Sequence, residues 1–123
     1  MTNRYLTYLV VKDGNGNTLI QKRTAKGIWH PLYEYPLLET PAATTQEEAA
    51  GLIRHYEGLG FVPLQITLLH PEPVVHKLSH QHLYVRFWEV KTDSVLAKAI
   101  GFQEVKTYPF PVVIYNFIEK HWE

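Results

Sequence analysis

The chain has 123 residues, 46% hydrophobic and 20% charged, which predicts one globular domain over residues 1–123. Its 12 basic and 12 acidic residues cancel, which argues against a stand-alone DNA-binding protein, because phosphate neutralisation supplies most of such affinity. Cysteine is absent, which excludes disulfides, thiolate zinc sites and iron–sulfur clusters held by this chain. No apolar run approaches the ~20 residues that span a bilayer, so we expect a cytoplasmic protein without membrane contact.

The first third of the chain has strand and turn patterns. Residues 5–12 are β-branched and aromatic and predict a strand. A turn rich in glycine and asparagine follows, and residues 18–23 predict the second strand of a hairpin. We expect a short strand near residues 33–35 and irregular structure over residues 37–43.

One helix is predicted after this segment. Thr44 or Thr45 is suited to its N-cap, and Thr45 with Glu48 fits a capping box. Gly58 and Gly60 are expected to end the helix. Residues at helical spacing predict one buried face, made of Ala49, Leu52, Ile53, Tyr56 and Leu59.

The following segment predicts further strands. Residues 64–70 read as a strand, residues 74–77 as an extended arm, and residues 78–80 as a turn. Residues 83–90 form a long strand with bulky side chains at both odd and even positions, so both faces of the sheet should be covered.

The last segment is expected to hold a polar loop over residues 93–101, a short edge strand over residues 102–106 and a final helix. Pro111 is suited to the first turn of that helix. Its predicted buried stripe consists of Val112, Tyr115, Ile118 and Trp122, with Ile114 beside it. The elements together predict an α+β fold in which a mixed sheet is sandwiched between helices.

The turn before the long strand gathers polar side chains. His76, His80 and His82 lie close together in sequence, with Lys77 and Ser79 between them. An ordinary hairpin turn with solvated histidines is the simplest interpretation. A binding loop is the alternative, because a turn at the end of a rigid strand holds donors precisely. We expect no metal, since neither cysteine nor paired carboxylates accompany the histidines.

Four short motifs follow one another along the chain. Residues 26–29 (Lys-Gly-Ile-Trp) and 32–36 (Leu-Tyr-Glu-Tyr-Pro) are followed by residues 78–80 (Leu-Ser-His) and 108–111 (Tyr-Pro-Phe-Pro). In order and spacing these motifs resemble the C-terminal domain of the MutY family of adenine DNA glycosylases, whose recognition loop reads Phe-Ser-His. The resemblance covers nearly the whole chain and implies a Nudix-like fold.

A working Nudix hydrolase is the first rival interpretation. Such enzymes hold magnesium with helical carboxylates in the pattern G-x5-E-x7-R-E-U-x-E-E-x-G-U. We place the final Gly-U pair of this pattern on Gly60 and Phe61. Only Glu57 of the required carboxylates then remains, and Arg54 stands at the position of the glutamate in the Arg-Glu pair. A cation there would repel the metal. We therefore expect the fold to be kept and hydrolysis to be lost.

The resemblance implies a function in DNA repair. It implies that Ser79 contacts 8-oxoguanine opposite a mispaired adenine, because oxidation converts N7 of guanine from an acceptor into a donor. Leu78 stands where the family has phenylalanine and would act as a wedge, and His80 would contact a phosphate or orient the loop. Lys77 and Arg86 are plausible phosphate contacts from their positions near the turn.

The expected partners are double-stranded DNA that contains 8-oxoguanine opposite adenine, and a bacterial catalytic domain. That helix-hairpin-helix domain, with its iron–sulfur cluster, would lie outside residues 1–123, so we expect neither a cofactor nor enzymatic activity in this chain alone. Two alternatives stay open: a divergent Nudix hydrolase of nucleoside diphosphate compounds, and a protein-interaction module that keeps only the fold.

Overall fold

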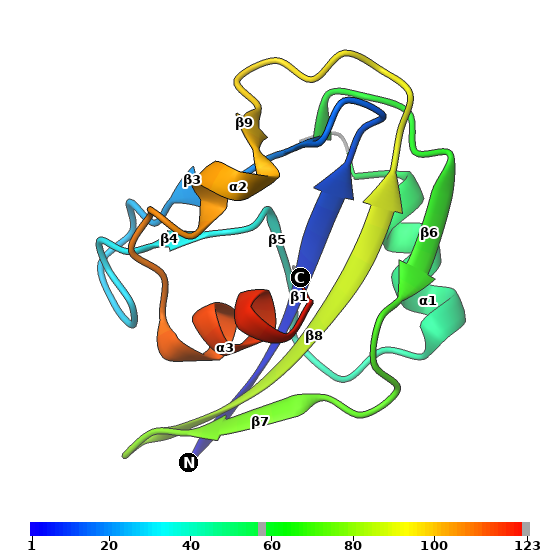
Figure 1. Ribbon diagram of the computed structural model, residues 1–123. Helices are drawn as coiled ribbons and strands as arrows, with labels where there is room; N and C mark the ends of the chain where they lie inside the picture. Colours follow the sequence, from blue (N-terminus) through cyan, green and yellow to red (C-terminus); the bar gives the residue numbers. More distant parts are fainter. Residues whose placement is uncertain (57–58, 122–123) are drawn as a thin grey trace.

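Two long parallel strands form the centre of the molecule (Figure 1). The computed structural model describes residues 1–56 and 59–121. β1 (Thr2–Lys12) and β8 (Gln81–Lys91) pair over all eleven residues of each strand. Both strands are rich in β-branched and aromatic residues that pack well on a pleated sheet.

Three shorter strands complete the main sheet, in the order β5-β1-β8-β6 with β7 also on β8. β5 (Leu37–Thr40) runs antiparallel to β1. β6 (Gln65–Leu68) and β7 (Val74–Lys77) are both antiparallel to β8, β6 at its C-terminal end and β7 at its N-terminal end. The sheet is therefore mixed, as predicted.

Five small elements lie beside the main sheet. β2 (Asn17–Thr18) pairs with β9 (Ile100–Gly101), and β3 (Gln21–Lys22) pairs with β4 (Tyr33–Glu34). α2 (Phe102–Val105) follows β9 directly. In Figure 1 the α2 helix and the β3–β4 pair lie on the same side of the molecule as α3.

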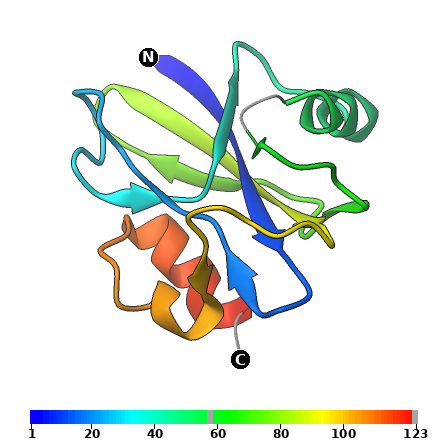
Figure 2. The same ribbon diagram turned by 90° about the horizontal axis from the view of Figure 1, so that it is seen from above.

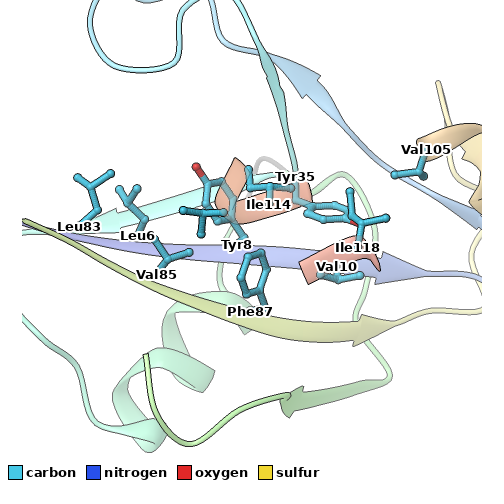
Figure 3. Packing of buried hydrophobic residues seen from close by; sticks show 11 residues of the cluster. Leu6, Tyr8, Val10, Tyr35, Leu83, Val85, Phe87, Val105, Ile114 and Ile118 are labelled. Carbon is cyan, nitrogen blue, oxygen red and sulfur yellow. The ribbon is translucent and has the colours of Figure 1, made fainter. Parts of the chain in front are cut away.

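The other two helices lie on opposite faces of the sheet, as Figure 2 shows. α3 (Val112–His121) covers one face, where Leu6, Tyr8, Val85 and Phe87 form the core with Ile114 and Ile118 (Figure 3). α1 (Gln46–Arg54) covers part of the other face, and packs against Leu9, Val11, Trp88 and Val90. The predicted α+β sandwich is confirmed. None of the described helices is long and apolar enough to cross a membrane.

Several predicted strands are wrong. Residues 18–23 do not form a hairpin with β1, because β5 and β8 occupy both edges of β1. Residues 37–43 are not irregular throughout, since β5 takes up residues 37–40. The predicted edge strand over residues 102–106 is replaced by helix α2, which takes up residues 102–105, because a run this short has too few residues for periodicity to decide.

The buried faces of both long helices also differ from the prediction. Thr45 does form the capping box, but α1 ends at Arg54, so its buried face shrinks to Ala49 and Ile53, while Leu52 is 44% exposed. In α3 the buried residues are Val113, Ile114 and Ile118, whereas Val112 and Tyr115 are exposed. The predicted roles of Gly58 and Trp122 fall outside the described residues.

Candidate functional site

The turn between β7 and β8 is held by backbone hydrogen bonds. Leu78 N–H donates to the Gln81 carbonyl at 2.8 Å, which leaves Ser79 and His80 as the two residues of the turn. The backbone N–H of Thr2 donates to the His80 carbonyl at 3.1 Å, so the start of β1 also holds the turn. The side chains of Ser79 and His80 are both exposed. The turn thus presents a hydroxyl and an imidazole from a fixed backbone.

The two residues before the turn have different surroundings. Leu78 is half-buried and packs against the core on the α3 face of the sheet. Lys77 is exposed and lies opposite His82, one ladder position away from the core residue Leu83, so it faces the α1 side. Contact with DNA stays a prediction for both, and a wedge role requires Leu78 to turn away from the core.

Arg86 lies apart from the turn. It is six residues from His80 along β8, and an extended strand rises about 3.3 Å per residue, which separates the two by roughly 20 Å. Arg4, which the sequence analysis did not single out, is nearer: its Nη1 donates to Gln81 Oε1 at 3.2 Å. The Nε and Nη2 atoms of Arg4 donate to the Glu39 carboxylate, and this hydrogen bonding lowers the pKa of Glu39.

The three histidines do not converge. His76 lies opposite Leu83 and His82 lies opposite Lys77, so adjacent ladder positions place the two imidazoles on opposite faces of the sheet. His80 is at the turn between them. Within the described ranges, no group of three His, Cys, Asp or Glu side chains has the geometry to hold a metal ion.

A buried carboxylate organises the segment beside β7. Glu34 is 4% exposed and accepts hydrogen bonds from the Tyr8 hydroxyl at 3.0 Å, Gln21 Nε2 at 2.9 Å and Arg23 Nη1 at 2.6 Å. Burial, followed by the charge of Glu34, raises the pKa of Tyr8. Arg23 therefore belongs to the interior, although the lysines on either side of it in sequence, Lys22 and Lys26, are exposed.

Arg23 connects this carboxylate to an aromatic loop. Its Nε donates to the Ile28 carbonyl at 3.2 Å, and its guanidinium carbon lies 5.9 Å from the centre of the Trp29 ring. The Trp29 ring in turn lies 6.2 Å from the His76 ring on β7. The loop over residues 23–32 is thereby held beside the strand that leads to the turn. Sequence reasoning missed this link, because nothing in the spacing of Arg23 and Glu34 predicts that they pair.

Helix α1 does not present carboxylates in a metal-binding arrangement within the described part of the chain. Glu48 accepts from Thr45 N–H at 3.0 Å, and this bond lowers the pKa of Glu48. Glu47 also lies in the first turn, while the last turn carries Arg54. Glu57, the carboxylate that the hydrolase pattern retains, lies outside the described residues.

Comparisons with known proteins bear on this arrangement. The sequence model of the NUDIX domain family matches residues 7–120. The fold is similar to that of the E. coli ORF135 protein, with 16% identity, a TM-score of 0.67, and coverage of 97% of this chain and 88% of that chain. No curated protein sequence gives a significant match.

Two further solved structures are similar. The C-terminal domain of mouse MUTYH, solved in complex with human PCNA, has 16% identity and a TM-score of 0.69, with 95% of this chain and 87% of that chain covered. The MutT protein from Methanosarcina mazei Go1 has 14% identity and a TM-score of 0.62, with 97% and 92% covered. At these identities the similarity establishes the fold, which hosts more than one function.

Proposed function

We propose, from the premise that this chain belongs to the NUDIX domain family, that it is a lesion-recognition domain of an adenine DNA glycosylase. In this role it contacts 8-oxoguanine opposite a mispaired adenine. The observation that carries the proposal is the exposed Ser79–His80 turn, held at the end of two long paired strands. A base reader needs such a rigid mount, because a loosely held donor or acceptor discriminates poorly.

The side chains of the turn match the chemistry of the lesion. Oxidation places a hydrogen on N7 of guanine, and the Ser79 hydroxyl can accept a hydrogen bond from it. Unmodified guanine offers only an acceptor at N7. The Ser79 hydroxyl then loses this hydrogen bond or must donate instead of accept. The His80 imidazole can donate to a neighbouring phosphate oxygen, while its backbone carbonyl is already bonded to Thr2.

We also propose that this chain alone hydrolyses neither nucleotides nor glycosidic bonds. Glu48 is tied to the N-cap, and Arg54 adds a positive charge to the last turn of α1. The net charge of zero supports a division of labour, in which a separate catalytic domain supplies most phosphate contacts and cleaves the adenine. The lack of cysteine fits the reducing bacterial cytoplasm as the location.

Binding to short duplexes tests the proposal. Fluorescence anisotropy at low salt compares DNA that carries 8-oxoguanine opposite adenine with DNA that carries guanine there. We expect a preference of about fivefold for the lesion, the value of one hydrogen bond worth about 1 kcal/mol. The double variant Ser79→Ala/His80→Ala should abolish this preference. A preference that survives the double substitution would refute the proposed reader.

The matched control is Thr67→Ala/His55→Ala, which removes an exposed hydroxyl and an exposed imidazole elsewhere. Thr67 pairs with Glu89, nine residues along β8 from His80 and so about 30 Å away. The control should keep the preference. The same variants, mixed with an adenine glycosylase catalytic domain, should show the same ranking in adenine removal. Magnesium-dependent phosphate release from a nucleotide panel, abolished by Glu57→Gln, would favour the hydrolase alternative.

A further inference from the structure

A small hollow lies on the sheet face that α1 only partly covers. Figure 1 shows α1 beside β6, while the N-terminal part of β8 extends past it toward the turn. There the rings of Tyr5 and Tyr84 stack with their centres 5.1 Å apart, and Thr7 lies opposite Arg86. The hollow is lined by these four residues together with Leu6, Thr40, Ala43, Thr44 and Pro73.

Arg86 is the only charged side chain in this lining. It is half-buried, and among the described residues it has neither a hydrogen-bond nor an ion-pair partner. Arg4 and Arg23 by contrast bind the carboxylates of Glu39 and Glu34. A partly buried guanidinium loses hydration, and none of the described residues replaces it, so an anion is the missing partner that chemistry predicts.

The place of Arg86 in the sheet keeps its surroundings open. β6 pairs with β8 up to Trp88, and β7 pairs with β8 from Val85. Arg86 thus lies between these two ladders, where residues 69–73 connect β6 to β7. Its side chain stands roughly perpendicular to the sheet, on the face that it shares with Thr7 and Tyr84.

The size and lining of the hollow select the ligand. Its volume of about 60 Å³ is well above the roughly 10–15 Å³ that a single water needs, so a small oxyanion can enter it. Apart from Arg86, every polar side chain in the lining is a hydroxyl. Thr40 already donates to the Ala42 carbonyl, while the hydroxyls of Thr7 and Thr44 can donate to an anion.

We propose that Arg86 and the surrounding hydroxyls bind a phosphate group. The guanidinium supplies two parallel hydrogen bonds to the phosphate oxygens, the geometry in which arginine surpasses lysine. The site lies roughly 20 Å from the Ser79–His80 turn and does not depend on lesion recognition. The phosphate comes from a free nucleotide end or from a nucleic-acid backbone, which share the same chemistry.

Thermal unfolding in inorganic phosphate tests the site, with sodium chloride of equal ionic strength as the reference. At a concentration about tenfold above the dissociation constant, binding raises the midpoint of the wild-type chain by about 5 °C beyond any general salt effect. Arg86→Gln measures that general effect, because phosphate also stabilises proteins by exclusion from their surface. Arg54→Gln, which removes an exposed arginine on α1, is the matched control and should keep the full gain.

Two results would overturn the proposal: an equal gain in Arg86→Gln, or loss of the gain in Arg54→Gln. NMR titration gives a second measurement, in which amide shifts at Tyr5, Thr7 and Tyr84 must move with phosphate and stay fixed with acetate. A dinucleotide with a 5′-phosphate and the same dinucleotide with a 5′-hydroxyl distinguish the two sources. If only the 5′-phosphate form raises the midpoint, the ligand is a nucleotide end. If both forms raise it, the ligand is a backbone phosphate. The Ser79→Ala/His80→Ala variant should keep the gain, so failure of lesion recognition is distinguishable from failure here.

Discussion

Replacement of Arg23 by alanine tests whether a buried ion pair holds the loop beside β7. The side chains of Arg23 and Glu34 are 11% and 5% exposed, and Nη1 lies 2.6 Å from Oε1. Removal of one partner from a buried pair costs about 3–5 kcal/mol, because the other charge stays buried without compensation. Glu34 keeps Tyr8 and Gln21 as donors, so we expect the lower end, about 3 kcal/mol.

Urea unfolding followed by circular dichroism measures this loss, which should lower the midpoint without a change in slope. Arg4→Ala is the matched control. Arg4 makes two hydrogen bonds to the Glu39 carboxylate, at 2.8 and 2.9 Å, but the side chains of Arg4 and Glu39 are 25% and 36% exposed. A pair this exposed is worth only about 0–1 kcal/mol.

A double substitution checks the cause. Arg23→Ala combined with Glu34→Gln removes the unpaired charge, so its cost should be smaller than the sum of the single costs by more than about 1 kcal/mol. Equal losses for Arg23→Ala and Arg4→Ala, or strict additivity in the double variant, would refute the reasoning that burial makes the Glu34 pair decisive.

Four further predictions concern the core and α1. Because the pKa of Tyr8 is raised, the unfolded chain loses its phenol proton first, and wild-type stability should fall above pH about 10 more steeply than that of Tyr8→Phe in urea unfolding. Ile53→Ala should cost about 3 kcal/mol and Leu52→Ala less than about 1 in the same assay, and equal costs would contradict the assigned buried face. Thr45→Ala should cost about 1 kcal/mol through loss of the N-cap. Because the pKa of Glu48 is lowered, stability should fall as the pH drops through its ordinary value of 4.5, and Glu48→Gln should weaken that dependence.

The sequence was sufficient to predict features that depend on neighbouring residues, such as the N-cap of α1 and the side-chain pattern of β8. Thr45 begins α1 because its hydroxyl and the Glu48 carboxylate satisfy backbone N–H groups within one turn. Alternation along residues 83–90 predicted correctly that both faces of β8 are covered. The pairing of residues 18–23 was not predictable in this way, because a turn brings two segments together but the competition of β5 and β8 for the edges of β1 decides which strands pair.

In the candidate site, too, local features were predictable from the sequence and tertiary contacts were not. The turn at Ser79 and His80 was predictable from the flanking strand patterns. The distance of Arg86 from it follows only once β8 is known to run as one strand from Gln81 past Arg86. The pairing of Arg23 with Glu34, eleven residues apart, depends on the β3–β4 ladder that aligns Gln21 with Glu34. Such contacts come from tertiary structure, and no local pattern records them.

The two ends of β8 serve separate parts of the molecule, and this separation bears on how hydrolysis could be lost without loss of the turn. At the C-terminal end, Trp88 and Val90 pack against α1. At the N-terminal end, β7 and the start of β1 hold Ser79 and His80. Several carboxylates on α1 would repel one another without a metal, so a helix that lacks them is free of that repulsion, and the turn is not affected. Under the proposed function, a domain that needs no metal can therefore keep the sheet and its turn without an acidic helix face.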